Sequence, residues 1–370
     1  MTGFQRQLVL VPQRWWRGNP GLALLAGLCL IAVFAVRWLW PNAPWTPGPT
    51  GPVRLERTIT VSAFGDWLAP IVFSRDGRTI AAMGDEKAYL YNLTTGRRAG
   101  IWTNPDTVHD KPTELAFTLD GKALLISNSG ELSAYLWNIA TGTVAATFPD
   151  PPNTSIDDTA LSPDGTLLAE EANWAGTTYL WNTVTRHYAG VLNDPGFGAE
   201  SLAFSPDGAI LAVGDSWVVG PSRQHGWVAL WNVASRKISA SYRLPHHADV
   251  QSVSFSPEGT LLAAASIHHT YLWDVTTGQL IQTLSGPRGS VIRQIAFSPD
   301  GRMLAAVSTS TAACIWDLKT GKIVATMPDP SNAEIASIAY SPDGKTLAVG
   351  DFHSHIFLWN VSQTERQPRG

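Results

Sequence analysis

The feature that most constrains the fold of this chain is a short motif that recurs seven times. The motif has the form aromatic-Ser-Pro-Asp-Gly, with substitutions in several copies, and successive copies are 42 to 51 residues apart. Its glycines are Gly77, Gly121, Gly165, Gly208, Gly259, Gly301 and Gly344. A period in this range indicates a repeat architecture in which each copy forms one supersecondary unit.

Each motif is followed by a short apolar run and then by an aromatic residue that precedes Asn or Asp. These aromatic residues are Tyr91, Trp137, Trp181, Trp231, Trp273, Trp316 and Trp359. Asp-Gly between two apolar runs predicts a tight hairpin turn, and each unit has room for four short strands. One such sheet cannot bury both faces, whereas seven arranged radially cover one another. We therefore expect an all-β chain that forms a seven-bladed β-propeller.

These motifs resemble the WD-repeat β-propeller family over residues 53–365. The aromatic-Asn/Asp pair, as in Trp137-Asn138, and the repeat period carry the resemblance. Asp beside proline ahead of several units, as in Pro149-Asp150-Pro151, resembles bacterial members, in particular the extracytoplasmic propellers of actinobacterial membrane kinases. The sequence motifs of a kinase are themselves missing. The Gly-His that many members place before the first strand is also largely missing, so the family's hydrogen-bonded tetrad is not carried over.

The seventh unit ends at Trp359-Asn360-Val361, one strand short of the others. Residues 57–61 (RTITV) have strand character and precede the first unit. We expect this segment to supply the missing strand and to close the ring.

Residues 1–52 differ in composition from the rest of the chain. Gly21 to Val36 contains no charged residue, and with the next four residues the run reaches about the 20 needed to cross a bilayer. Tryptophans lie on both sides of this run, as at membrane interfaces. We expect a retained transmembrane helix (a signal anchor) over residues 20–40, with a cleaved signal peptide as the alternative.

Arg6, Arg14 and Arg17 precede the apolar run and only Arg37 follows it directly, which predicts a cytoplasmic N-terminus and an extracytoplasmic propeller at the cell membrane. Residues 41–52 contain five prolines and predict an extended spacer. The expected organisation is a basic tail (1–19), the helix (20–40), the spacer (41–52), the propeller (53–365) and a C-terminal tail (366–370).

Charge and cysteine content exclude several classes of function. Residues 1–52 carry four arginines and no acidic residue, so the remainder has 22 basic and 30 acidic residues. An acidic body of this kind does not favour nucleic-acid binding. The two cysteines, Cys29 and Cys314, are too few for a disulfide framework or a cysteine-based zinc site.

In antiparallel blades, the short Asp-Gly and Thr-Gly turns lie at one face and the irregular connections at the other. The longest connection, residues 215–225, belongs to the fourth unit. Aromatic and arginine side chains on such loops are typical of partner-binding sites. The candidates are Trp67, Trp174, Phe197, Trp217, Arg223 and His225. The alternative is that some of these rings pack beneath their own loops.

Metal binding and catalysis have weaker sequence support. Five histidines of the fourth and fifth units belong to connections of this face, namely His225, His246, His247, His268 and His269. The last four are candidate metal ligands, although ordinary loop histidines are the favoured interpretation. Four aspartates of this face could surround the channel, or could initiate turns beside proline, namely Asp106, Asp150, Asp194 and Asp329.

No hydrolase or nucleotide-binding motif is present. We expect a non-catalytic protein-interaction scaffold or sensor without a cofactor, with a propeller enzyme or small-ligand binder as the alternative.

Overall fold

The computed structural model describes residues 53–61, 68–84, 87–103, 111–129, 134–148, 156–172, 176–193, 199–218, 224–245, 249–286 and 291–362. All of them belong to one compact unit, Pro49–Gly370. The predicted transmembrane helix, the spacer and both tails lie outside these ranges. Within the ranges, no helix has the length and apolar character needed to cross a membrane.

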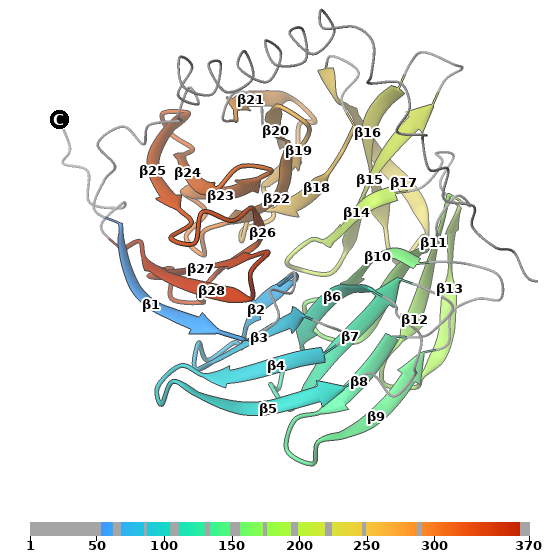
Figure 1. Cartoon of the computed structure of the whole chain (residues 1–370). Coiled ribbons are helices and arrows are strands. Elements are labelled where there is room, and N and C mark those ends of the chain that lie inside the picture. Colours follow the sequence, from blue (N-terminus) through green and yellow to red (C-terminus); the bar gives the residue numbers. More distant parts are fainter. Residues whose placement is uncertain are drawn as a thin grey trace, which may run out of the picture. The chain divides into compact units, whose positions relative to one another are not determined.

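The described residues form seven four-stranded antiparallel sheets arranged radially as blades (Figure 1). Blade one comprises β2 (Ile71–Phe73), β3 (Thr79–Gly84), β4 (Lys87–Asn92) and β5 (Arg97–Thr103). Blade two comprises β6 (Lys111–Phe117), β7 (Ala123–Ser129), β8 (Ala134–Asn138) and β9 (Thr143–Phe148). Blade three comprises β10 (Ile156–Leu161), β11 (Leu167–Ala172), β12 (Thr177–Asn182) and β13 (His187–Asn193). Blade four comprises β14 (Ala199–Phe204), β15 (Ile210–Val218), β16 (Gln224–Asn232) and β17 (Lys237–Arg243).

The remaining three blades complete the ring. Blade five comprises β18 (Ser252–Phe255), β19 (Leu261–Ala265), β20 (His269–Asp274) and β21 (Leu280–Ser285). Blade six comprises β22 (Ile292–Phe297), β23 (Met303–Ser308), β24 (Ala312–Asp317) and β25 (Lys322–Pro328). Blade seven comprises β26 (Ile335–Tyr340), β27 (Thr346–Asp351), β28 (His355–Asn360) and the N-terminal strand β1 (Arg54–Thr60). The predicted all-β seven-bladed propeller is thus confirmed.

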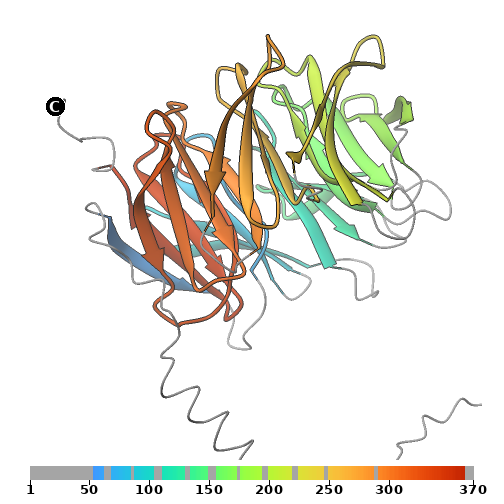
Figure 2. The same cartoon turned by 90° about the horizontal axis from the view of Figure 1, so that it is seen from above.

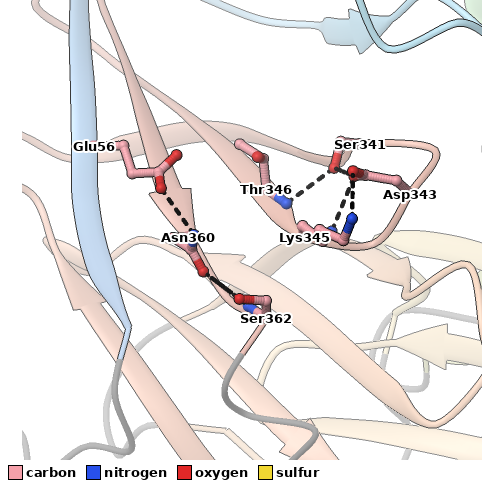
Figure 3. Close-up of polar contacts among 7 residues, drawn as sticks. All are labelled: Glu56, Ser341, Asp343, Lys345, Thr346, Asn360 and Ser362. Carbon is pink, nitrogen blue, oxygen red and sulfur yellow. Dashed lines mark hydrogen bonds and ion pairs between the residues drawn. The ribbon is translucent and has the colours of Figure 1, made fainter.

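The ring is closed by the strand that the sequence predicted. β1 pairs antiparallel with β28, so that Arg54 lies opposite Asn360 and Thr60 opposite His355. The Asn360 amide also donates to Glu56 Oε1 at 2.8 Å, beside the first turn of blade seven (Figure 3). Backbone pairing between the two ends of the described chain therefore joins the first blade to the last.

Burial follows the radial position of each strand. In blade six, the whole second strand β23 is buried, because neighbouring blades cover both of its faces. The fourth strands lie at the rim, and β21 there is mostly exposed. The aromatic residues of the third strands are buried in the core, with Trp181 half-buried as the exception. Small apolar residues such as Ala305 and Ala306 fit the second strands, since the blades converge toward the axis.

The turns between first and second strands share one hydrogen-bonded structure in six blades. A Ser or Thr hydroxyl donates to the turn aspartate, and the aspartate also accepts the N–H two residues further along. The pairs, with oxygen–oxygen distances of 2.6–2.8 Å, are Ser74–Asp76, Thr118–Asp120, Ser162–Asp164, Ser205–Asp207, Ser298–Asp300 and Ser341–Asp343. The motif glycine has a φ of 67–72° in all seven blades, where a Cβ is unfavourable. These aspartates are turn formers, as the motif predicts.

These turns and those between third and fourth strands form one face of the propeller, which we call the turn face. The connections between second and third strands and between blades form the opposite, loop face. Figure 2 shows the blades from the side, with the two sets of connections at opposite edges. The loop face is where the blades differ, and it positions the candidate site.

Candidate functional site

The most prominent feature of the loop face is a long hairpin in blade four. β15 and β16 pair from Ile210–Asn232 as far as Val218–Gln224. Pairing with β17 begins at Trp227, and pairing with β14 ends at Asp215. The hairpin therefore continues as a two-stranded ribbon beyond the four-stranded sheet. The sequence had suggested one irregular loop over residues 215–225. That expectation was wrong, because both strands extend and leave only 219–223 between them.

Two contacts hold the base of this ribbon. The indole Nε1 of Trp227 donates to Asp215 Oδ2 at 3.1 Å, and Asp215 is buried. On the other edge, the Leu244 N–H donates to the Gly226 carbonyl at 2.9 Å. These two hydrogen bonds hold the base of the ribbon, so the ribbon is a structured hairpin and not a simple loop.

The structure tests none of the six predicted partner-binding side chains. Trp67, Trp174, Phe197 and Arg223 lie outside the described residues. Trp217 and His225 are cross-strand partners in the ribbon, and the description there covers the backbone alone. The structure places these two residues together, and the site itself stays a prediction.

The five candidate histidines do not all lie in loops. His225 belongs to β16 and His269 to β20, so their assignment to connections was wrong. His268 is exposed, His269 is half-buried with its ring 6.0 Å from that of Tyr271, and His246 and His247 lie outside the described residues. Within the described ranges, no three His, Cys, Asp or Glu side chains are placed to hold a metal ion.

Blade seven carries a polar network that sequence reasoning missed. Asp351 is fully buried at the end of β27 and accepts the His355 N–H at 2.7 Å. Its Oδ2 lies 2.9 Å from His355 Nδ1 and accepts the Ser331 hydroxyl at 2.8 Å. The signal was Asp-x-His-x-His at the end of a strand, which could have indicated an Asp–His contact.

Asp329 lies beside this network, in the connection from blade six. Its Oδ1 accepts the Ser331 N–H at 2.6 Å, whereas Oδ2 is buried without a hydrogen-bond partner among the described residues. Burial raises the pKa of this carboxyl, and the nearby Asp351 raises it further. From the sequence, Asp329 could either line the channel or initiate a turn, and the structure shows the turn contact. The buried Oδ2 was not anticipated.

A second unanticipated group lies where blade six meets blade seven. Arg293 forms an ion pair with Glu334 at 2.9 Å, and its guanidinium carbon lies 5.8 Å from the centre of the Phe352 ring. The three side chains are partly exposed at the loop face. Arginine and aromatic residues are enriched at interaction hot spots, so this group extends the candidate face.

Blade three buries carboxylates where other blades bury small apolar residues. Glu170 accepts the Trp181 indole N–H at 2.6 Å, and Glu171 accepts the Thr178 hydroxyl. Asp158 accepts the Leu202 N–H of blade four at 2.6 Å. Burial and then the charge of Asp158 raise the pKa of Glu114 well above its ordinary range. The Leu-Leu-Ala-Glu-Glu-Ala run could have indicated this departure. In the contacts described, Glu170 and Glu171 join strands within blade three, and Asp158 joins blade three to blade four.

The described cysteine offers no nucleophile. Cys314 is buried in β24, and burial raises the pKa of its thiol to about 12. A thiol with that pKa is protonated at neutral pH and unreactive.

The fold and this face define a closed seven-bladed β-propeller with one regular and one irregular face. The WD40 family profile, described as "WD domain, G-beta repeat", matches residues 239–274, 278–317 and 321–360. Each match runs from the fourth strand of one blade through the third strand of the next. The propeller therefore contains WD40 repeats, and the offset between repeat and blade explains why β1 belongs to blade seven.

A curated protein with significant similarity is Meiotic fizzy-related protein 2 of Schizosaccharomyces pombe. It is 28% identical over 99 residues, which is 26% of this chain and 18% of that protein. The chain thus spans less than a fifth of the relative's length, and the likeness concerns the repeats.

Proposed function

We propose that this chain is a membrane-anchored WD-repeat propeller that binds a protein or peptide partner at its loop face without catalysing a reaction. The observation that carries the proposal is the contrast between the faces. The turn face repeats one hydrogen-bonded structure in six blades, whereas the described part of the loop face carries a long hairpin in blade four and a polar network with an Arg293–Glu334 ion pair where blades six and seven meet. A partner can distinguish only a surface that is itself distinctive.

The blade-four ribbon is the proposed centre of this site. It presents the backbone of Trp217 and His225 beyond the sheet on a base held by Asp215 and Trp227. A rigid scaffold that positions variable segments is the usual arrangement of binding surfaces. WD40 repeats support the proposal, since such propellers generally bind proteins.

The membrane location rests on the sequence of residues 20–40 and the basic residues before it. In this proposal the N-terminus is cytoplasmic and the propeller is extracytoplasmic, as the resemblance to bacterial membrane-kinase propellers also suggests. Protease added to intact spheroplasts should then digest the propeller. Protection until the membrane is permeabilised would instead place the propeller in the cytoplasm.

The binding site is tested by crosslinking and capture from the native membrane with three baits. Trp217→Ala should weaken capture of a partner by about 2 kcal/mol or more, as truncation of a hot-spot aromatic does. Lys345→Ala is the matched control, since Lys345 lies on the turn face and is 3.6 Å from Asp343. Loss of the partner with the Lys345→Ala bait alone would move the site to the turn face.

A further inference from the structure

Four exposed arginines gather around one turn where blade seven meets blade one. The turn is Leu93–Gly96, between β4 and β5. Arg57 of β1 donates to the Leu93 carbonyl at 2.7 Å, and the Arg78 carbonyl accepts the Leu93 N–H at 2.7 Å. Arg97 and Arg98 follow directly at the start of β5. We call Arg57, Arg78, Arg97 and Arg98 the arginine patch.

In the described structure, Arg78 forms no ion pair with its turn aspartate, although its charge, after the hydrogen bonds from Ser74 and the Arg78 N–H, also lowers the pKa of Asp76. Lys122, Arg302 and Lys345 occupy the position of Arg78 in their own turns, and each lies 3.6–3.7 Å from its turn aspartate. Within the described ranges, no carboxylate lies within ion-pair distance of any patch arginine. The neighbouring Glu56 is hydrogen-bonded to Asn360. The patch therefore presents four positive charges, with the Asp76 carboxylate nearby, on an otherwise acidic body.

Arg98 also replaces an apolar residue. In all six other blades, the residue of the fourth strand that faces the third-strand tryptophan is apolar or aromatic. These pairs are Val144–Trp137, Tyr188–Trp181, Ile238–Trp231, Leu280–Trp273, Ile323–Trp316 and Leu55–Trp359. In blade one the pair is Arg98–Tyr91. Blade one thus has a cation where the repeat pattern otherwise favours an apolar side chain.

One member of the patch, Arg57, lies on β1, the strand through which the chain enters the propeller. β1 begins at Arg54, opposite Asn360 and next to the turn face, and runs toward the loop face at Thr60. Thirteen residues, 41–53, separate it from the predicted transmembrane helix. Even fully extended, thirteen residues span at most about 47 Å, so the turn-face end of β1 must stay within that distance of the helix end if the anchor is retained.

We infer that the arginine patch binds the anionic headgroups of phospholipids and holds the propeller with its turn face toward the membrane. Basic residues near an anionic surface are attracted over roughly one Debye length. The acidic remainder of the propeller is repelled by the same surface, which favours one orientation. The loop face then points away from the bilayer, toward partners. The inference rests on the proposed membrane anchor.

The test uses the full chain with Cys29→Ser, reconstituted into vesicles of phosphatidylcholine with or without phosphatidylglycerol. A fluorophore at Thr94→Cys reports the patch, and one at His353→Cys reports the loop face, both positions being exposed. Quenching by headgroup-labelled lipid should be about twofold stronger for the Thr94 probe in anionic vesicles than in neutral ones. The His353 probe should show no such increase, and the difference should vanish in about 0.5 M salt.

A triple variant, Arg78→Gln with Arg97→Gln and Arg98→Gln, should abolish the lipid dependence and leave Arg57 in its structural contact. Lys319→Gln with Lys322→Gln, on the turn face of blade six, is the matched control and should retain it. Equal quenching of the Thr94 probe in both lipids, or retention of the dependence in the triple variant, would overturn the inference. Suppression by acidic peptide without any lipid dependence would assign the patch to a protein partner.

Membrane anchoring by residues 20–40 is measured separately from lipid binding by the patch. Carbonate-resistant flotation with neutral vesicles depends on residues 20–40 and not on the patch. A chain that floats but shows no lipid-dependent quenching retains the anchor and contradicts the patch. A chain that fails to float on neutral vesicles, yet responds to added anionic vesicles, contradicts the anchor and supports the patch.

Discussion

The two faces of this propeller use the same kind of residue in opposite ways. On the turn face, hydrogen bonds from Ser205 and the Ala209 N–H lower the pKa of Asp207, and the equivalent aspartates of most blades behave alike. On the loop face, burial raises the pKa of Asp329. A carboxylate in a satisfied turn stabilises the fold when ionised, whereas a buried one with an unpaired oxygen opposes it. The turn aspartates therefore stabilise the fold, whereas Asp329 imposes a local cost at the loop face.

The largest expected effect comes from opening the ring of blades, on which both faces depend. Deleting residues 55–61 removes β1 except Arg54, together with the buried side chains of Ile59 and Val61, and leaves blade seven open. At about 2 kcal/mol for each buried aliphatic side chain, the free energy of unfolding should fall by at least about 4 kcal/mol. Denaturation of the full chain in detergent, followed by tryptophan fluorescence, measures this. Deleting 366–370 is the control, and equal stability of the two deletions would show that closure does not depend on β1.

A smaller effect on stability is expected from substitutions in single turns of the turn face, and its direction differs between blades four and five. Asp207→Ala removes the contacts with the Ser205 hydroxyl and the Ala209 N–H, and should lower the free energy of unfolding by about 1–2 kcal/mol. Blade five has Glu258 at this position, and no corresponding contact with Ser256 is present in the described structure. Glu258→Asp should therefore raise stability by about 0.5–1 kcal/mol. If both substitutions changed denaturation midpoints in the same direction, the shared turn structure would not explain the stability of this face.

The smallest expected effect is on the pH dependence of the free energy of unfolding. Its sign differs between an aspartate of the loop face and one of the turn face. The pKa of Asp329 is raised in the folded state, so its stabilising contribution is present at low pH and lost as pH rises through that pKa. Asp329→Asn should accordingly raise the free energy of unfolding by up to about 1 kcal/mol at pH 7, and by little below about pH 4.

Asp207→Asn is the matched control for this pH comparison. The pKa of Asp207 is lowered, so its contribution is present at neutral pH and lost as pH falls. The substitution should therefore destabilise the protein at pH 7 and have little effect in acid. Denaturation curves at the two pH values measure both variants, and a destabilising Asp329→Asn at pH 7 would contradict the proposed cost of the buried carboxylate.

Much of the fold could be predicted because each repeat encodes its own local structure. Ser-Pro-Asp-Gly specifies a turn through contacts within five residues, and the third-strand aromatic marks a strand that both neighbours bury. The closing strand was predictable because the seventh unit lacked one. The candidate site was less predictable. Irregular connections carry no repeated signal, so residues 215–225 were interpreted as a loop although most of them extend the hairpin.

The sequence by itself determined seven blades, their turns, their core aromatics and the closure by β1, because these depend on contacts that are local or repeated. Only the tertiary structure decided which distant groups meet. The proximity of Asp329 to Asp351 through Ser331, the contact of Arg293 with Phe352, and the arginine patch each join separate strands or blades. Such contacts depend on strand register and on the neighbours that ring closure creates. No single repeat contains that information.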